Sequence, residues 1–318
     1  MNVQQIFDLA IKLGVDADLR GKAAVQKMLR RKKELYDKLG KDAKAEFDTE
    51  ALTNPYLDSR VHYDSGKPVK KVLVGIDMEG DELIIANQMK DIDAVIAHHP
   101  RGKGLADLAD VMHLQAEVLA GYGVPINVAE GVQREKISEV ARSLSAVNHY
   151  RPVDMARLLN LSYLNIHTPA DNLVASFLKK KITSGKCEYV GDIMKMLKGI
   201  PEYTAAVKLG TGPKVLTGSA NNHCGKIAIT EITGGTEGSP KIYEKMAQAG
   251  IGTVISMHQS EEHRKEAEAA HINVIIAGHI SSDSLGMNLF LDELEKKGIK
   301  LIPCSGLIRV SRNKKNRQ

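Results

Sequence analysis

Short apolar runs alternate with longer amphipathic stretches along most of the chain. In the first half, each run has the length and composition of a buried strand, and most are followed by residues with helical spacing. The predicted strands of this half are KKVLVGID (70–77), AVIA (94–97), PINVA (125–129) and SYLNIH (162–167). The predicted helices lie near 83–89, 105–122, 132–145, 153–160 and 173–181. Strands that alternate with helices predict an α/β fold with a largely parallel sheet.

The second half repeats the same order of strand and helix. Its predicted strands are KIAITEI (226–232), TVISMH (253–258), NVIIAGH (273–279) and KLIPC (300–304). Its predicted helices include EEHRKEAEAA (261–270) and LFLDELEKKG (289–298). We therefore expect two α/β lobes with mostly parallel sheets, one at 67–190 and one at 191–318.

The first 66 residues differ from the rest because they are polar and helical in pattern. LAIKLGV has helical spacing, and AAVQKMLRRKKELYDKLG is rich in strong helix formers. The stretch 52–68, LTNPYLDSRVHYDSGKP, contains Asn-Pro, Asp-Ser and Ser-Gly pairs that favour turns. We predict an N-terminal helical segment and linker at 1–66, ahead of the two lobes.

Composition narrows the class of protein. The chain is 43% hydrophobic and 26% charged, as is usual for globular domains. Its three cysteines are odd in number and share no metal-ligand spacing, which indicates a reducing compartment. No apolar run approaches the ~20 residues that cross a bilayer, and no secretory signal is evident at the start. We expect a cytoplasmic protein that has no contact with a membrane.

The net charge of +5 is concentrated in two places. In 27–44, acidic residues interleave with the basic ones, which is typical of a solvated helix face. The tail 309–318, RVSRNKKNRQ, has the composition of a disordered segment. With 4% aromatic residues and no tryptophan, the chain lacks a stacking platform for single-stranded nucleic acid. Nucleic acid is therefore not an expected partner.

Histidines and carboxylates stand where several predicted strands end. In open α/β sheets, ligands bind outside the carboxyl ends of the strands, so side chains at these ends come together. The residues concerned are Asp77, His98, His99, His167, Asp171, His258, His279 and Asp283. This recurrence is harder to attribute to chance than any one histidine on a loop.

Two of these strand ends share a spacing. His167 and Asp171 are four residues apart, and so are His279 and Asp283. At the start of a helix, positions i and i+4 lie on one face. Imidazole nitrogens with carboxylate oxygens suit zinc, iron, manganese, cobalt or nickel, and an aspartate can bridge two ions. Helix N-capping is the alternative for each aspartate, but it does not explain the histidines.

The chain resembles the Nif-three-like dinuclear metal-centre proteins, also described as GTP cyclohydrolase I type 2-like. The resemblance rests on strand-His-His-Pro at 94–100, His-Thr-x-x-Asp at 167–171 and Gly-His-x-x-x-acid at 278–283, in that order. VGID (74–77) and GGTEG (234–238) add to it. Roughly 68–310 is covered.

The resemblance implies a two-lobed α/β protein that assembles into a homohexamer, with two divalent ions in each subunit. Carried over by position, the metal ligands are His98, His99, Asp171, His279 and Asp283. His167 also lies on the motif, and we expect it beside the ligands or as a marginal one. No catalytic residue and no organic cofactor follows from the resemblance.

Two departures from the family pattern bear on the site. The family usually has glutamate where this chain has Asp283, so the carboxylate arm is one methylene shorter and one ion is expected to be held less tightly. Arg101 and Lys103 follow the paired histidines where apolar residues are usual, which predicts a more cationic rim.

Three functional hypotheses remain open at this stage. The first is a metal-dependent hydrolase that acts on a nucleotide or another anionic, phosphate-containing small molecule. The second is a non-catalytic metal-binding adaptor, or a storage or sensing protein. The third is an α/β protein whose histidines are incidental. A cavity of substrate size beside the site favours the first over the second.

Overall fold

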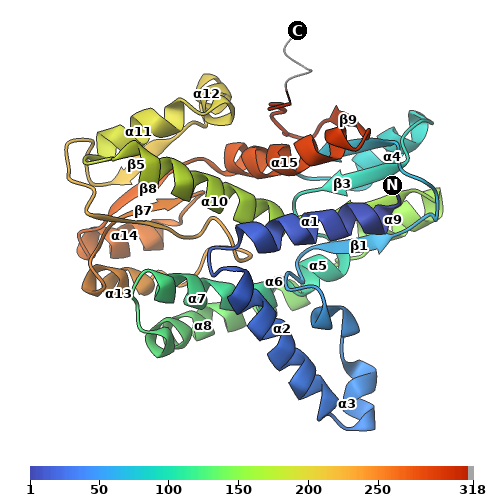
Figure 1. Ribbon diagram of the computed structural model, residues 1–318, viewed down its shortest axis with the longest axis horizontal. Helices are drawn as coiled ribbons and strands as arrows, with labels where there is room; N and C mark the ends of the chain where they lie inside the picture. The colour runs from blue at the N-terminus through green and yellow to red at the C-terminus, as the bar shows by residue number, and fades with distance from the viewer. Residues whose placement is uncertain (314–318) are drawn as a thin grey trace.

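The computed structural model describes residues 1–313, which form two β-sheets enclosed by helices (Figure 1). The strands of the first sheet are β1 Arg60–Tyr63, β2 Lys71–Gly75, β3 Ala94–Ala97, β4 Ser162–Asn165 and β9 Lys300–Pro303. Those of the second sheet are β5 Lys214–Thr217, β6 Lys226–Ile229, β7 Ile251–Ser256 and β8 Asn273–Ile276. The orders are β1-β4-β3-β2-β9 and β5-β8-β7-β6.

Helices separate most of the strands. In the first half they are α1 Val3–Ala17, α2 Lys22–Asp37, α3 Lys41–Glu46, the 3-10 helix η1 Thr49–Leu52, α4 Gly80–Gln88, α5 Gly102–Ala106, α6 Leu108–Val111, α7 His113–Gly121, α8 Ile126–Ser145 and α9 Arg151–Leu159. In the second half they are α10 Thr168–Gly185, α11 Val190–Lys198, α12 Pro201–Lys208, α13 Ile242–Gln248, α14 Glu261–Ala269 and α15 His279–Lys296.

Each sheet is parallel except at one edge. In the first, β2, β3, β4 and β9 run parallel, and β1 pairs antiparallel with β4. In the second, β6, β7 and β8 run parallel, and β5 pairs antiparallel with β8. The predicted α/β class with two mostly parallel sheets is confirmed.

The last strand of the chain lies in the first sheet. β9 pairs with β2 in parallel register, with Val72 opposite Leu301. The chain therefore returns from the second sheet to the first after α15. The proposed boundaries at 1–66, 67–190 and 191–318 stay a prediction.

The predicted strand at 125–129 is wrong, because these residues begin α8. Pro125 stands at the N-cap position, where its missing N–H is no loss. Ala129, Gln133 and Val140 are then buried at helical spacing. The apolar run was too short to distinguish a strand from the first turn of a helix.

The N-terminal segment is helical as predicted, but its linker is partly regular. Residues 60–63 of the expected loop form β1, which adds an edge to the first sheet. Arg60 is buried there and forms ion pairs with Asp48, Glu50 and Asp107. The segment is therefore bound to the first lobe through its own strand.

Helices α1, α10 and α15 pack against one another and cover one face of the two sheets (Figure 1). One apolar core joins α1 and α15 to β2 and β3, and another joins α10 and α11 to β6, β7 and β8. Gly286 allows α15 to approach α10: a Cβ atom there would collide with the backbone oxygen of Ala170 and lie 2.8 Å from Val174 Cγ2. The N-terminal turns of α10 and α15 are thereby held side by side.

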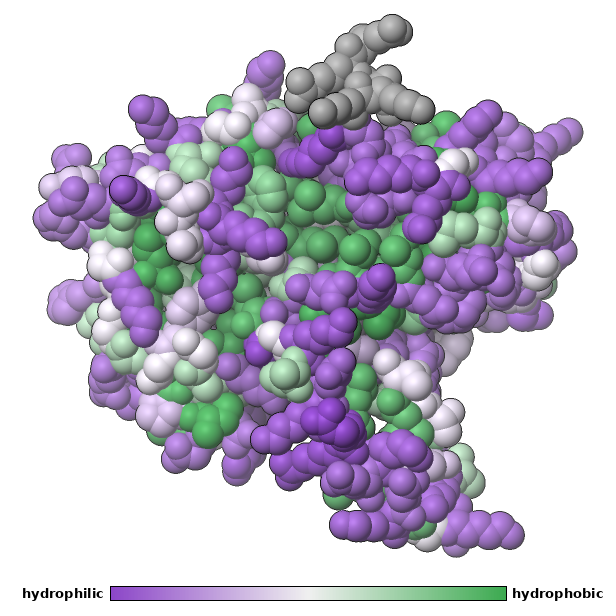
Figure 2. All heavy atoms as spheres, viewed as in Figure 1, coloured by the Kyte–Doolittle hydropathy of each residue, from purple (hydrophilic) through white to green (hydrophobic). Residues whose placement is uncertain are grey.

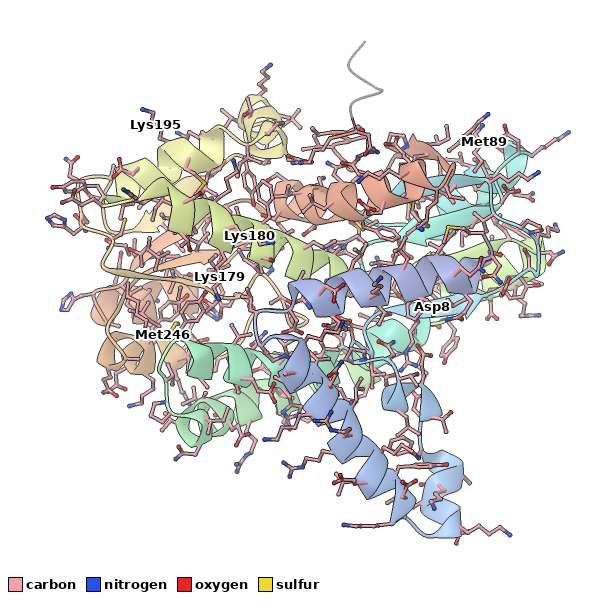
Figure 3. The ribbon with its side chains drawn as sticks, viewed as in Figure 1. Asp8, Met89, Lys179, Lys180, Lys195 and Met246 are labelled. Carbon is pink, nitrogen blue, oxygen red and sulfur yellow. The ribbon has the colours of Figure 1, made fainter. Side chains whose placement is uncertain are left out.

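The opposite faces of the sheets are covered by other helices. α4 and α9 pack on the first sheet, and α7, α8, α13 and α14 lie on the second. Asp8, Lys179 and Lys180 are exposed on α1 and α10, whereas Met246 of α13 is buried (Figure 3). α2 and α3 project from the body as a largely hydrophilic arm (Figure 2).

The end of the chain is partly ordered, contrary to the predicted disorder of 309–318. Arg309 pairs with Asp292 and Glu295 of α15, and Arg312 pairs with Glu202. Residues 314–318 lie outside the described residues. Within 1–313, no helix combines the length and apolar character that a membrane span requires.

Candidate metal centre

The paired histidines stand at the turn that follows β3. The backbone N–H of His98 donates to Gly75 O at 3.0 Å, and that of His99 donates to Ile76 O at 3.0 Å. These two bonds hold consecutive residues against the end of β2, outside regular strand alternation. Because the chain turns here, both imidazoles face the same side, and their ring centroids lie 5.2 Å apart.

The other predicted residues stand at the starts of two helices. His167 is the N-cap residue of α10 and Asp171 lies in its first turn. Gly278 is the N-cap residue of α15, where its φ of 109° would strain other residues, and His279 begins the helix. The aspartates are therefore not N-caps. The spacing of four places Asp171 and Asp283 one turn into their helices, facing the histidines.

The five predicted side chains come together in the structure. His98 Nε2 lies 3.5 Å from Asp171 Oδ1 and 3.5 Å from Asp283 Oδ1. Asp283 Oδ2 lies 3.4 Å from His99 Nε2 and 3.6 Å from His279 Nε2. The two oxygens of Asp283 thus face different histidines. Although aspartate is shorter than the glutamate usual in the family, Asp283 reaches both sides of the cluster because α15 brings it close. The expected difference in affinity between the two ions stays a prediction.

The orientation of the two inner histidines is fixed by their Nδ1 atoms. His98 Nδ1 lies 2.9 Å from the carbonyl oxygen of Ile166, and His99 Nδ1 lies 2.8 Å from Asp77 Oδ1. Since a carbonyl oxygen only accepts, His98 must carry its proton on Nδ1. Its Nε2 then presents a lone pair to the cluster. A hydrogen-bonded Nδ1 with a free Nε2 is the usual arrangement of histidines that bind metals.

Four buried atoms of the cluster have no hydrogen-bond partner. They are His98 Nε2, Asp171 Oδ1 and both carboxylate oxygens of Asp283. Burying such groups without a partner is costly, and all four are acceptors when the carboxyl groups are ionised. A cation between them would satisfy all four. The donor set therefore fits a divalent ion.

The pKa values show how closely the groups interact. Burial lowers the pKa of His98, and it lowers that of His279 to about 4. Burial also acts to lower the pKa of His99, but Asp283 and Asp77 outweigh it and raise the pKa to about 9. For Asp171, burial and then the charge of Asp283 raise the pKa well above its usual value. Burial opposes ionisation of Asp283, yet the neighbouring histidines keep its pKa low.

Three groups of ligand atoms could each hold a metal ion. They are His98 with Asp171 and Asp283, His99 with His279 and Asp283, and His98 with His99 and His167; within each group the atoms lie within 4.8 Å of one another. Asp283 belongs to two groups and Asp171 to one. The buried cluster could therefore hold metal ions, as the sequence predicted.

Sequence reasoning missed Asp58, the hydrogen-bond partner of His167. His167 Nδ1 lies 2.8 Å from Asp58 Oδ2, and its Nε2 faces Asp171 Oδ2 at 3.8 Å. Asp58 comes from the stretch that we expected to be a linker, 109 residues away in sequence. No motif around LDSR signalled it. Asp77 was recognised at its strand end, but not as the residue that orients His99.

The expected cationic rim is neutralised by ion pairs. Arg101 pairs with Asp77 and Glu79, and Lys103 pairs with Asp48. The two basic residues therefore add no net positive charge beside the histidines.

The outer histidines of the late strands do not join the ligand groups. The His258 ring lies 4.6 Å from that of His279 and lines the same cavity. His263 is buried between Glu231 and Glu237. His258 therefore lies beside the cluster, and neither of these histidines belongs to a ligand group.

The cavity beside the cluster is small. Its volume is about 20 Å³, and its walls include His167, His279, Asp283, His258 and the loop that follows β6. Ligand pockets for small molecules are usually in the range of ~300–1,000 Å³. The space in this conformation is enough for water or ions only.

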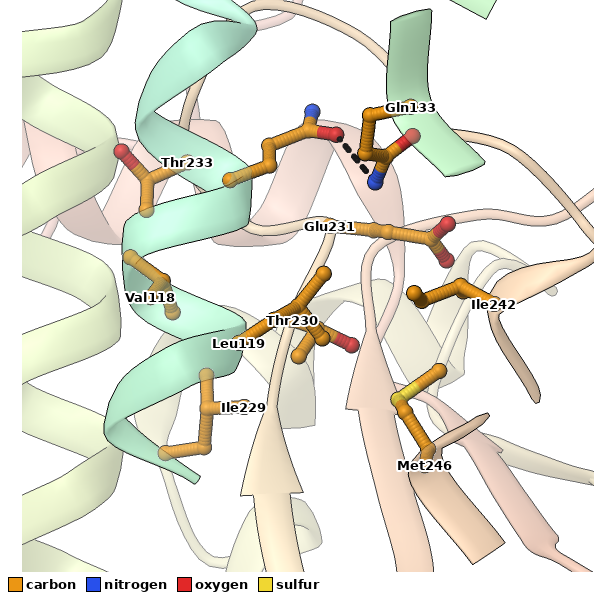
Figure 4. A pocket seen from close by; sticks show the side chains of 10 residues that line it. Val118, Leu119, Gln133, Ile229, Thr230, Glu231, Thr233, Ile242 and Met246 are labelled. Atoms are coloured by element: carbon orange, nitrogen blue, oxygen red, sulfur yellow. Dashed lines mark hydrogen bonds between the residues drawn. The ribbon is translucent and has the colours of Figure 1, made fainter. Parts of the chain in front are cut away.

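The loop 230–239 also lines a second cavity of about 20 Å³ (Figure 4). Glu231 and Thr233 line both. Gln115 of α7 donates to the carbonyl oxygens of Gly234 and Thr236, and its own side-chain oxygen accepts from Gln133 of α8. These hydrogen bonds hold the GGTEG segment against α7 and α8. GGTEG thus lies in a fixed connection between β6 and α13.

The fold and the site define a class: an α/β protein with two mostly parallel sheets and a buried histidine–aspartate cluster that could hold metal ions. Among solved structures, the chain is similar to a NIF3 superfamily protein from Sphaerobacter thermophilus, with 30% identity and a TM-score of 0.72 over 79% of this chain and 92% of that one. The chain belongs to the NIF3 superfamily.

Weaker similarities are also found. One is to reduced HcgD from Methanocaldococcus jannaschii, at 15% identity and a TM-score of 0.46 over 77% of this chain and 87% of that one. Another is to a Bacillus cereus protein related to NIF3, at 10% identity and a TM-score of 0.41 over 77% and 89% of the two chains. No protein-family model and no curated protein matches the chain.

Proposed function

We propose that this protein binds two divalent metal ions and catalyses hydrolysis of a phosphate-containing small molecule, such as a nucleotide. The observation that carries the proposal is the set of four buried, unpartnered acceptor atoms on His98, Asp171 and Asp283. His98, Asp171 and Asp283 would hold one ion, and His99, His279 and Asp283 the other. The nitrogen and oxygen donors suit zinc, iron, manganese, cobalt or nickel.

A divalent ion held there supplies Lewis acidity, which lowers the pKa of a bound water towards ~7 and polarises a substrate oxygen. The chain itself contributes the two carboxylates and the oriented imidazoles. Two divalent ions against two carboxylates leave the centre positive, which favours an anionic substrate. Arg101 and Lys103 add nothing to this positive charge, because both are already paired with carboxylates.

Entry of a substrate requires the cavity to widen. The loop 230–239 lies over the site, and its Gly234 and Gly235 both have φ near 90°. Gln115 is one of several polar contacts that fix this loop, together with Asn172 at Thr233 and Gln133 at Ser239. Binding of a nucleotide-sized molecule would therefore displace the loop from Gln115.

The test is a hydrolysis screen over nucleotides and phosphoesters, with metal-free protein reloaded with zinc, manganese or iron. We expect turnover that depends on the added metal and is lost in Asp171→Asn. The matched control is Asp192→Asn, a carboxylate in the first turn of α11 that is absent from the ligand groups. Metal-loaded protein that hydrolyses none of these compounds contradicts the catalytic proposal.

A second candidate function is a non-catalytic metal-binding adaptor or a storage or sensing protein. The small cavity favours it, because a closed site suits retention of an ion more than turnover. It predicts tight metal binding with no hydrolysis in the same screen.

A cytoplasmic location and a homohexamer are also part of our proposal. The location rests on the three free cysteines, and the homohexamer rests on the family resemblance.

A further inference from the structure

The N-terminal segment brings a buried carboxylate to the metal centre. Asp58 is fully buried, and its Oδ2 accepts from His167 Nδ1 at 2.8 Å and from Thr168 Oγ1 at 2.6 Å. Its backbone oxygen accepts from Asn165 Nδ2 at 2.6 Å. A carboxylate is buried only where hydrogen bonds offset its loss of solvent. These contacts fix Asp58 against the start of α10.

The same contacts determine which nitrogen of His167 is free. An ionised carboxylate only accepts, so His167 carries its proton on Nδ1. The backbone N–H of His167 donates to Ser59 Oγ at 2.9 Å, which also restrains the residue. Nε2 is left with a lone pair, 3.8 Å from Asp171 Oδ2 and within reach of the ligand atoms of His98 and His99.

We propose that Asp58 is a positioning residue of the metal centre: it orients His167 so that Nε2 serves as a further ligand. The inference rests on the proposed metal binding and deepens it. A carboxylate hydrogen-bonded to a ligating histidine fixes its tautomer and raises its basicity. The N-terminal segment would thus contribute to the site through Asp58, and Arg60, two residues on, links this segment to the first lobe through its ion pair with Asp107.

A purely structural role makes a different prediction. Asp58 also accepts from Thr168, the first residue of α10, and a negative charge at a helix N-terminus is stabilising. If Asp58 served only to hold the start of α10 through Thr168, loss of the Thr168 contact would weaken metal binding as much as loss of the Asp58 carboxylate. Thr168→Val removes that contact and keeps the side-chain shape, so it is the matched control.

The experiment measures zinc affinity by competition with a chromophoric chelator, for the full-length wild type, Asp58→Asn, Thr168→Val and His167→Ala. In Asp58→Asn the amide is a weaker acceptor, and when turned it donates to Nδ1 and forces the proton onto Nε2. We expect one zinc site to weaken ~10- to 100-fold, as is usual when such an orienting partner is lost. His167→Ala should weaken the same site, while Thr168→Val should stay close to wild type.

Two other outcomes with folded variants would overturn the inference. Wild-type affinity in Asp58→Asn would show that the carboxylate has no role in binding, and equal losses in Asp58→Asn and Thr168→Val would assign it to helix capping. If Asp58→Asn does not fold, His167→Ala decides. Unchanged zinc affinity in that variant contradicts the inference, and a ~10- to 100-fold loss at one site supports it. If the wild type takes up no zinc, the proposed function fails together with this inference. If the wild type binds zinc and a His98→Ala, His99→Ala double variant does not, the proposed metal binding stands, and the Asp58→Asn result then tests the role of Asp58 alone.

Discussion

His98, His99 and His167 are each held through Nδ1, which turns Nε2 towards the cluster. The partners of the Nδ1 atoms differ: a backbone carbonyl for His98, the half-exposed Asp77 for His99 and the buried Asp58 for His167. The carboxylates differ as well, since Asp283 is shared between two ligand groups and Asp171 is not. These differences lead to separate predictions for single residues.

Substitution of the shared carboxylate should affect both ions. Asp283→Asn keeps the shape of the side chain but removes the charge that faces three histidines, so we expect both zinc sites to weaken by more than the ~10- to 100-fold typical of outer-shell changes. Asp171→Asn should weaken one site only. Isothermal titration with zinc measures both. Equal loss of two sites in both variants would refute the sharing that we infer.

Metal binding should release protons at neutral pH. Contacts with Asp283 and Asp77 outweigh burial and raise the pKa of His99 to about 9, so at pH 7 the ring is protonated and a metal at Nε2 must displace that proton. Zinc affinity should therefore rise with pH up to about 9. Titration calorimetry in two buffers of different ionisation enthalpy should detect at least one proton released for each chain. Affinity that does not change between pH 6.5 and 9 would contradict this account.

The same proton also affects the metal-free fold. Because the pKa of His99 is raised from 6.5 to about 9 on folding, its stabilising effect is complete below pH 6.5. The effect is lost as the pH rises through 9. Urea unfolding of the metal-free protein should therefore show a free energy of unfolding that falls between pH 6.5 and 9. In a His99→Gln variant, which lacks the titrating ring, this fall should be absent, and the same fall in both proteins would contradict the assignment to His99.

At the scale of elements, the site depends on the close approach of α10 and α15. Gly286→Ala would push a methyl group into Ala170 and Val174, so we expect a loss of about 2 kcal/mol in the free energy of unfolding and weaker zinc binding. Gly131→Ala is the control, because it lies in α8 with nothing near its Cβ position, and it should gain up to ~1 kcal/mol. Urea denaturation of both variants measures these changes. A Gly286→Ala variant as stable as Gly131→Ala would contradict the packing argument.

The elements that the sequence predicted well are those whose pattern is local. AVIA and NVII are buried strands because they are continuous apolar runs, and the residues of the i, i+4 pairs at 167–171 and 279–283 lie at helix starts, as their spacing indicated. PINVA was mistaken because a short apolar run also suits a helix that follows proline. The contact of Asp58 with His167 and the pairing of β9 with β2 were not predictable in this way, since the partners are distant in sequence and only the fold brings them together.

At the scale of the whole molecule, the family resemblance leads us to expect a homo-oligomer, most simply a hexamer. Size-exclusion chromatography with light scattering at micromolar concentration should then give a mass six times the 34.7 kDa of one chain. Dilution should leave this mass unchanged. A mass of one chain at that concentration would rule out the hexamer.

We propose that residues just after β3 and at the starts of α10 and α15 together form a metal centre. Elemental analysis of the purified protein, after loading with zinc and removal of the excess, tests it most directly in the wild type and in the His98→Ala, His99→Ala double variant. The account predicts up to two zinc ions for each wild-type chain and almost none in the double variant, with unchanged circular dichroism. No zinc in the wild type, or the same zinc content in both proteins, would contradict it.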